Sequence, residues 1–236
     1  KKLSFRKFIH NAVTVISCSA IVVQPALAQS IVGDAGAQSP TVLNTANGID
    51  MVMINRPNSG GVSHNTYQQF DVPDAGAILN NINTNSANTA LGGVVQGNSN
   101  LSGGAASLII NEVTAANPSL MSGYLEVGGV AADVIVANAY GITCDGCGFI
   151  NTDHVALTTG QLRFDPIGNL QDISVTGGAI NIGAGGADAR AVSQFDLITR
   201  QVNFAGSVQG QRVRVIAGQN DVIFTTAPVT PNGGND

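Results

Sequence analysis

The chain is organised around residues 98–159, which read NSNLSGGAASLIINEVTAANPSLMSGYLEVGGVAADVIVANAYGITCDGCGFINTDHVALTT. This stretch contains short apolar runs at 108–110, 124–127, 133–136 and 155–157, and its turns are rich in Asn and Gly. Gly adopts the left-handed backbone conformation freely and Asn tolerates it, so both suit tight corners between strands. No window has a sustained helical periodicity, and the stretch therefore predicts short β-strands with few or no helices.

The strand pattern continues beyond this stretch with a nearly constant spacing. Further apolar runs lie at 173–175, 179–182, 195–198, 202–204, 213–216 and 222–224. If Val134, Val155, Val175, Leu197 and Val215 are equivalent, the intervals between them are 21, 20, 22 and 18 residues. A period of about 20 residues predicts a solenoid, here an all-β parallel β-helix. A β-sandwich also has short strands and frequent turns, but the period favours the β-helix.

The sequence before the central stretch is less regular. Residues 31–50 mix Gly, Ala, Ser and Pro with few apolar pairs, which predicts a mobile start or an irregular cap. Residues 55–61, NRPNSGG, are a strong turn signal. Residues 83–90 are polar and predict a loop.

Residues 1–28 have the features of a secretory signal peptide. Four basic residues precede an apolar run at 12–23, and Ala26-Leu27-Ala28 follows as a small-residue cleavage site. The apolar run is shorter than the ~20 residues that a membrane span requires. We predict cleavage between Ala28 and Gln29, one elongated domain over residues 29–226, and the start of a continuation into a larger protein at 227–236.

Charge excludes two classes of partner for the segment after the leader. Four of the 10 Lys and Arg lie in the leader, so six Arg and all 15 acidic residues remain, and the net charge is 6 − 15 = −9. Nucleic-acid binding needs clustered basic side chains that neutralise phosphates. We therefore expect neither nucleic acid nor an anionic membrane surface as a partner.

Cys144 and Cys147 form a C-x-x-C pair and are the only cysteines after the leader. A thioredoxin-like redox motif would open a helix in a βαβ unit, whereas this pair lies among strand and turn sequences. A zinc site would need a second pair of ligands. In an exported protein we favour a short disulfide that pins a turn and contributes about 2 kcal/mol. Redox and metal chemistry are the alternatives.

Other titratable residues give weak signals for catalysis. His64 and His154 are the only histidines after the leader, and we expect neither to be catalytic. Paired carboxylates act in glycosidases, and such a pair would come from five aspartates if they lined one face of the solenoid: Asp165, Asp172, Asp188, Asp196 and Asp221. Each is next to a different turn or strand, so we expect solvated surface acids, with no catalytic residue, cofactor or metal site.

Three segments carry a family signature. Residues 61–72, GVSHNTYQQFDV, resemble the pattern G-[LV]-S-H-N-x-[YF]-x-x-F-[ND]-V, and residues 98–101, NSNL, resemble N-P-N-L. Residues 132–142, ADVIVANAYGI, are similar to A-D-[VI]-[VI]-[IV]-A-N-P-N-G-I, and residues 143–152, TCDGCGFINT, follow the members that have a cysteine pair. In this order they resemble the secretion domain of two-partner-secreted exoproteins, the family of filamentous haemagglutinins, haemolysins and contact-dependent inhibition toxins.

The resemblance implies a right-handed parallel β-helix with an N-terminal β cap and extra-helical hairpins. It implies secretion targeting and no catalysis. The signal peptide would engage the general export machinery, and periplasmic POTRA-type domains of an outer-membrane transporter would then recognise the chain, which would act as a monomer. The protein would be secreted or lie on the surface of a Gram-negative-type envelope. The residues implied in recognition are Ser63, His64, Asn65, Asn98, Asn100, Leu101, Asn138, Gly141 and Ile142.

Two departures from the family pattern concern turns. Ser99 replaces the Pro of N-P-N-L, and Ala139-Tyr140 replaces the Pro-Asn of N-P-N-G-I. Because Pro fixes φ, we expect looser turns here. The parent protein would be an adhesin, a cytolysin or a contact-dependent inhibition toxin. A β-helical glycan-active enzyme and a module that binds a host surface are the alternative functions.

Overall fold

The computed structural model describes residues 30–224. The predicted signal peptide, its cleavage site at Ala28 and Gln29, and residues 227–236 lie outside the described residues. Within residues 30–224 the only helix is a 3-10 turn, η1 (Ser99–Leu101), and no helix has the length and apolarity to cross a bilayer.

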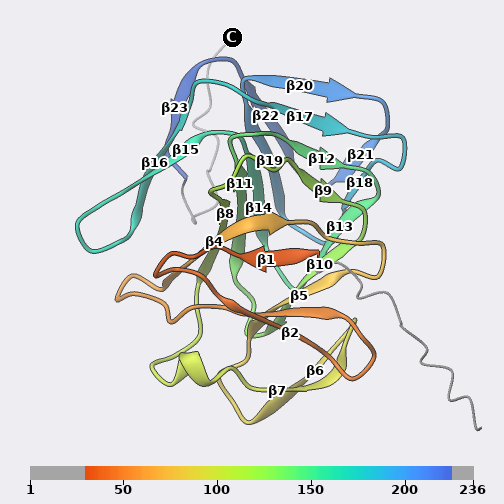
Figure 1. The fold of residues 1–236 in the computed structure, drawn as a ribbon. Coiled ribbons are helices and arrows are strands. Elements are labelled where there is room, and N and C mark those ends of the chain that lie inside the picture. The colour runs from red at the N-terminus through yellow and green to blue at the C-terminus, as the bar shows by residue number, and fades with distance from the viewer. Residues whose placement is uncertain (1–29, 225–236) are drawn as a thin grey trace, which may run out of the picture.

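Three sheets built from strands of successive coils form a parallel β-helix (Figure 1). Sheet 1 contains, in spatial order, β1 (Ile31–Gly33), β4 (Val62–Phe70), β8 (Leu108–Val113), β11 (Asp133–Asn138), β14 (His154–Thr158), β19 (Gln194–Thr199) and β22 (Val213–Ala217). Sheet 2 contains β2 (Thr41–Asn44), β3 (Asp50–Met53), β5 (Ala77–Asn81), β10 (Tyr124–Gly129), β13 (Cys147–Ile150), β18 (Ala187–Ala189) and β21 (Val208–Gly210). Sheet 3 contains β9 (Ser119–Met121), β12 (Ile142–Cys144), β17 (Ala179–Ile182) and β20 (Gln201–Phe204).

Each coil runs through the sheets in turn and lies on the coil before it. One coil follows β10, β11 and β12, and β13 then returns to pair in parallel with β10. Val134 pairs with Ile109 on one side and with Val155 on the other. These side chains are fully or almost fully buried and belong to one cluster that fills the inside of the coils. Burial of this kind supplies the main favourable term for stacking.

Sheet 1 is buried on its outer face as well. Ile110, Ile135 and Ala156 belong to a second apolar cluster that packs beneath a separate antiparallel sheet. This sheet contains β15 (Gln161–Phe164), β16 (Leu170–Val175) and β23 (Asn220–Val222), and its β15–β16 hairpin projects from the stack in Figure 1. Strands buried on both faces read as continuous apolar runs, which explains the runs in the sequence.

A second hairpin covers the outer face of sheet 2. It contains β6 (Ser86–Thr89) and β7 (Gly93–Gln96) in an antiparallel pair, and Val95 packs on Ile78 and Ile82. The buried carboxylate of Glu126 accepts hydrogen bonds from the backbone amides of Ala90 at 2.7 Å and Leu91 at 2.8 Å. Glu126 therefore fixes the tip of this hairpin, which leads directly into η1.

The N-terminal cap is more regular than the sequence suggested. The expected mobile or irregular start over 31–50 is wrong, because β1 pairs antiparallel with β4 and β2 pairs antiparallel with β3. The β cap and the extra-helical hairpins implied by the resemblance are confirmed. The expected loop at 83–90 is also wrong, since Ser86–Thr89 forms β6; its polar residues occupy an external hairpin, where few side chains are buried.

The predicted coil register holds only in part. The equivalence of Val134 with Val155 and of Leu197 with Val215 is confirmed. The predicted equivalence of Val175 with these coil residues is wrong, because β16 lies in the external hairpin and pairs antiparallel with β23. The hairpin is inserted between β14 and β17, and β14 aligns with β19 two residues away from the predicted match. Val175 resembles a coil residue because it is itself buried, against the outside of sheet 1.

Candidate functional site

Asn98 is the buried centre of the first Asn-rich turn. It caps η1, because its side-chain oxygen accepts a hydrogen bond from the backbone amide of Asn100 at 3.0 Å. Its Nδ2 atom donates to the carbonyl oxygens of Ile54 and Asn80, both at 2.9 Å. One side chain therefore joins the turn to the segments that follow β3 and end β5.

Asn100 and Leu101 lie on opposite sides of this turn. Asn100 is exposed, and its Nδ2 atom donates to the carbonyl oxygen of Ile54 at 3.0 Å. The Leu101 side chain is buried in the central cluster. Gly104 closes the turn with φ of 122°, a conformation that favours glycine, and its amide donates to the Leu101 carbonyl at 2.9 Å.

The second Asn-rich turn is built in the same way around Asn138. The buried Asn138 oxygen accepts from the amide of Tyr140 at 2.9 Å, and Nδ2 donates to the Asn117 carbonyl at 2.8 Å and the Ser119 hydroxyl at 2.9 Å. Gly141, with φ of 114°, donates its amide to the Asn138 carbonyl at 3.0 Å. The turn therefore depends on contacts with the preceding coil, and Ile142, which follows it, is buried in the central cluster.

Ser63 and Asn65 lie in β4, and their buried side chains also bond to the backbone of other segments. The Ser63 hydroxyl donates to the Asn55 carbonyl at 2.7 Å, and the Asn65 oxygen accepts from the Asn55 amide at 2.8 Å. Asn65 Nδ2 also donates to the carbonyl of Ile110 in the next coil at 3.2 Å. Both side chains are fully buried, so the folded surface does not present them.

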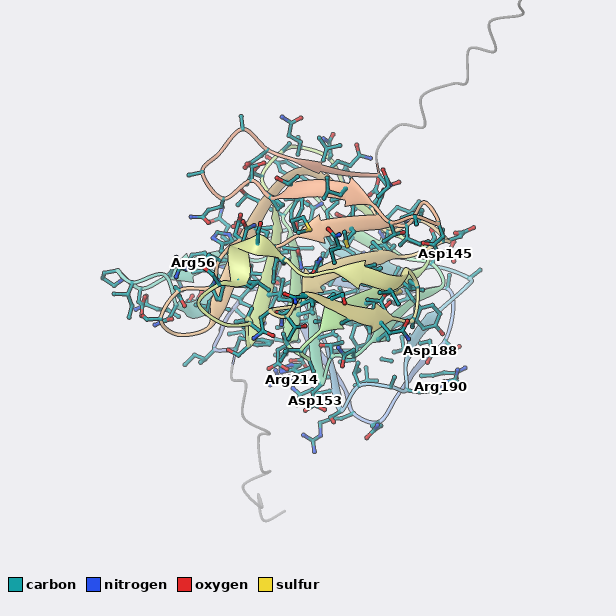
Figure 2. The ribbon with its side chains drawn as sticks, turned by 90° about the horizontal axis from the view of Figure 1, so that it is seen from below. Arg56, Asp145, Asp153, Asp188, Arg190 and Arg214 are labelled. Carbon is teal, nitrogen blue, oxygen red and sulfur yellow. A yellow bond between two sulfur atoms is a disulfide. The ribbon has the colours of Figure 1, made fainter. Side chains whose placement is uncertain are left out.

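His64 differs from its two neighbours because its side chain faces outward. Its Nε2 atom lies 2.7 Å from Glu112 Oε2, and its ring stacks on Phe164 of β15 with 4.6 Å between the ring centroids. Arg56 and Ile167 line a surface pocket with these two rings, and Figure 2 shows Arg56 beside the projecting hairpin. His64 therefore links the coils to the external sheet.

A charged cluster around Asp196 was missed by sequence reasoning. Its fully buried carboxylate lies 2.8 Å from His154 Nε2, and accepts from Gln194 at 3.0 Å and from Arg214 through two nitrogens. The His154 ring stacks on Phe224 with 4.4 Å between centroids. Only the register could have revealed the cluster, because these residues are aligned on β14, β19 and β22; Arg214 is labelled in Figure 2.

Two carboxylates beside His154 have pKa values that shift in opposite directions. Burial alone would raise the pKa of Asp196, but hydrogen bonds from His154, Arg214 and Gln194 outweigh it and lower the pKa. Burial raises the pKa of Asp133 to about 6, and its interaction with the neighbouring His154 offsets this rise only in part. Asp133 is thus a partly buried acid with an energetic cost of ionisation.

Cys144 and Cys147 are joined in a disulfide with 5.3 Å between their Cα atoms. Both are fully buried in the corner between β12 and β13, which agrees with the predicted short disulfide that pins a turn. Within residues 30–224, no group of three or more His, Cys, Asp and Glu has a geometry that would hold a metal ion.

The five candidate aspartates do not share one face of the coils. Asp196 lies in sheet 1, Asp188 in sheet 2 and Asp165 at the turn of the β15–β16 hairpin. Asp172 and Asp221 do approach each other in the external sheet, where Arg163 binds both. This arrangement differs from a pair of free carboxylates on either side of a glycosidic bond.

Comparisons with known proteins identify related sequences. The family model described as "TPS secretion domain" matches residues 28–235. The chain is 51% identical over 203 residues to the tRNA nuclease CdiA of Yersinia mollaretii, covering 86% of the chain and 7% of that protein. It is 42% identical over 227 residues to the tRNA nuclease CdiA-2 of Burkholderia pseudomallei, covering 96% of the chain and 7% of that protein. The chain thus spans about 7% of the length of these curated relatives.

A solved structure supports the fold and the family. The crystal structure of the filamentous hemagglutinin secretion domain aligns with a TM-score of 0.75 and 37% sequence identity, covering 82% of this chain and 65% of that one. Domains of this family target exoproteins for secretion through the Gram-negative outer membrane, so that the proteins are released or exposed on the cell surface. The chain belongs to the family of TPS secretion domains.

Proposed function

We propose that the chain delivers a contact-dependent inhibition toxin to its outer-membrane transporter, and that the transporter reads the Asn-rich motifs before the domain folds. Burial of the motif side chains supports recognition before folding. Six of them are buried in the folded domain: Ser63, Asn65, Asn98, Leu101, Asn138 and Ile142. A partner that recognises them must meet an unfolded or partly unfolded chain.

Folding also occupies the hydrogen-bonding groups of the motif side chains. The amide groups of Asn65, Asn98 and Asn138 are hydrogen-bonded to backbone or side-chain atoms in the folded coils. In the unfolded chain the same amides are free to bond with a partner. Folding therefore withdraws the motifs, because their hydrogen-bonding groups bind within the protein instead.

The partner in this proposal is a set of periplasmic POTRA-type domains, and the chain acts as a monomer. A signal peptide over residues 1–28 would bring the chain to the periplasm, and the family match beginning at residue 28 supports that boundary. The toxin assignment comes from the names of the relatives, and the chain matches only about 7% of the length of each. We assign no catalysis to residues 29–226, and the sequence of the full-length protein tests the assignment of the parent protein.

A secretion assay tests the targeting role. The chain, with its leader, is expressed with and without the transporter, and the culture medium and periplasm are compared. We expect export to the medium only with the transporter. Equal export in both strains would contradict the proposal.

A binding assay tests recognition before folding. The periplasmic domains of the transporter are immobilised, and the folded chain is compared with the chain captured during refolding from urea. We expect the folded chain to bind at least about 10-fold more weakly, because binding then requires local opening. An exposed change outside the family segments, Gln209→Ala in β21, is the control and should leave both affinities unchanged. Equal affinity of the folded and refolding chains would refute recognition before folding.

A further inference from the structure

The corner that contains Cys144 and Cys147 is closed on both sides by neighbouring coils. We infer that its disulfide forms on the unfolded chain, by thiol–disulfide exchange with a donor disulfide, and that oxidation therefore precedes the stacking of the central coils. Both sulfurs are enclosed by backbone from the coils before and after them.

The preceding coil encloses the corner from one side. The amide of Asp145 donates to the Met121 carbonyl at 2.9 Å, and the amide of Gly148 donates to the Gly123 carbonyl at 3.3 Å. A Cβ placed on Gly146 would lie 3.2 Å from the carbonyl oxygen of Ser122. The backbone of the corner is thus in close contact with the turn before it.

The following coil encloses it from the other side. The Gly183 amide donates to the Cys144 carbonyl at 2.8 Å, and the Gly146 amide donates to the Gly186 carbonyl at 2.8 Å. The Cys144 Sγ atom lies 3.4 Å from that Gly186 oxygen. The Gly185 amide also donates to Asp145 Oδ1 at 2.6 Å, and Figure 2 shows Asp145 at the edge of the stack.

Exchange chemistry needs room that this corner lacks. One cysteine thiolate attacks one sulfur of the donor disulfide and forms a mixed disulfide with it, and the other donor sulfur leaves as a thiolate. The second cysteine thiolate then attacks the cysteine sulfur of the mixed disulfide, and the remaining donor sulfur leaves as a thiolate. Two electrons pass from the cysteines to the donor, and the two protons lost by Cys144 and Cys147 are bound by the donor thiolates. Both cysteines are 0% exposed, so a donor cannot approach either sulfur in the folded coils.

The spacing of the pair permits oxidation without a fold. A separation of three residues makes a small loop that an unfolded chain closes by itself, and such a loop adds little width to an extended chain. If the chain crosses the periplasm unfolded, as the proposed function holds, the donor is a disulfide in that compartment. The order of oxidation and folding does not depend on that proposal.

Reactivity in vitro tests the order of events. The full chain, carrying its native disulfide, is treated with dithiothreitol in native buffer and in urea, and free thiols are counted by alkylation and mass spectrometry. We expect reduction at least about 100-fold slower in native buffer, because it must wait for local opening of the coils. In the reverse direction, a chain reduced in urea and returned to native buffer receives oxidised glutathione. It should either remain unfolded until it is oxidised, or fold and then resist oxidation. Equal rates of reduction in native buffer and urea would overturn the inference. A reduced chain that folds and is then oxidised as fast in native buffer as in urea would also overturn it.

A control variant removes the effect of urea on thiol chemistry. Tyr140 is exposed in a neighbouring turn, so Tyr140→Cys in a Cys144→Ser, Cys147→Ser background provides an accessible thiol. It should react with oxidised glutathione at similar rates in both buffers, and the oxidation rates of the native pair are divided by the change that it shows.

A cell experiment separates this inference from the proposed function. In cells without the transporter, the chain retained in the periplasm should be protease-sensitive and already oxidised. Retained chain with two free thiols would refute the inference even if targeting is correct. Oxidised chain that reaches the medium without the transporter would refute targeting and leave the order of oxidation and folding intact.

Discussion

Replacement of Asn98 by Ala should destabilise the folded domain by about 3 kcal/mol. Asn98 is 4% exposed and makes three hydrogen bonds, one accepted from the Asn100 amide and two donated to the carbonyls of Ile54 and Asn80. Each contributes a net ~1 kcal/mol. For a domain of this size, 1 kcal/mol corresponds to ~2–4 °C in melting temperature, so we expect a decrease of about 6–12 °C by circular dichroism or calorimetry.

Two matched variants identify which bonds carry this effect. Asn98→Asp keeps an oxygen that caps η1, but it loses both donors and places a buried carboxylate against the carbonyl oxygens of Ile54 and Asn80. Because an unpaired buried charge is costly, this variant should cost at least as much as Asn98→Ala. Asn100→Ala loses one well-formed bond of an exposed side chain, at 3.0 Å, and should cost at most ~1 kcal/mol. If Asn98→Asp melts at the same temperature as the parent chain, the capping oxygen alone matters, and the idea that Asn98 ties the turn to two other segments is refuted.

Three further predictions concern other named residues. Asp133→Asn should raise the melting temperature more at pH 7.5 than at pH 4.5, because a pKa raised from 3.8 to about 6 on folding costs stability increasingly between these values and fully above them; the opposite pH trend would contradict this. Ser99→Pro and Ala139→Pro should each stabilise by ~0.4–1 kcal/mol in urea titrations, since both positions follow a capping Asn at the start of a turn and Pro restricts the unfolded chain; a loss of stability would show that these turns reject Pro. Asp196→Asn should cost ~3–5 kcal/mol, because it leaves the partners of a fully buried carboxylate without their charge pair, and a cost below 1 kcal/mol would show that the pair contributes little.

Local signals in the sequence predicted the strands and the turns well. The predicted run at 179–182 coincides with β17 (Ala179–Ile182), and the runs at 108–110 and 133–136 lie within β8 and β11. These strands are buried on one or both faces, and their apolar side chains make the pattern readable. The Asn-Gly turns were readable because the left-handed conformation of residues such as Gly141 restricts which residue fits.

Long-range pairing could not be predicted from the same signals. Val175 carries the apolar pattern of a coil strand, yet it covers the outside of sheet 1, because burial against either face produces the same sequence pattern. His64 and His154 meet Glu112 and Asp196, which are 48 and 42 residues further along the chain. Such contacts depend on the number of residues inserted between coils, and the β15–β16 hairpin changes that number without a clear sequence mark.

The buried motifs couple stability to recognition, and two variants with similar stability losses can separate them. Asn98 lies in a family motif, whereas Asp196 lies in sheet 1 outside these motifs, and both side chains are buried. If the transporter reads the unfolded chain, Asp196→Asn should be secreted normally, because a less stable domain still presents its motifs. Asn98→Ala should be secreted poorly, because the unfolded chain lacks an amide that the transporter reads. If the transporter required the folded domain instead, both variants would lose secretion in proportion to their lost stability. A plot of secretion against melting temperature, with Asn100→Ala as a third point, therefore distinguishes a signal read in the unfolded chain from one that depends on the folded coils.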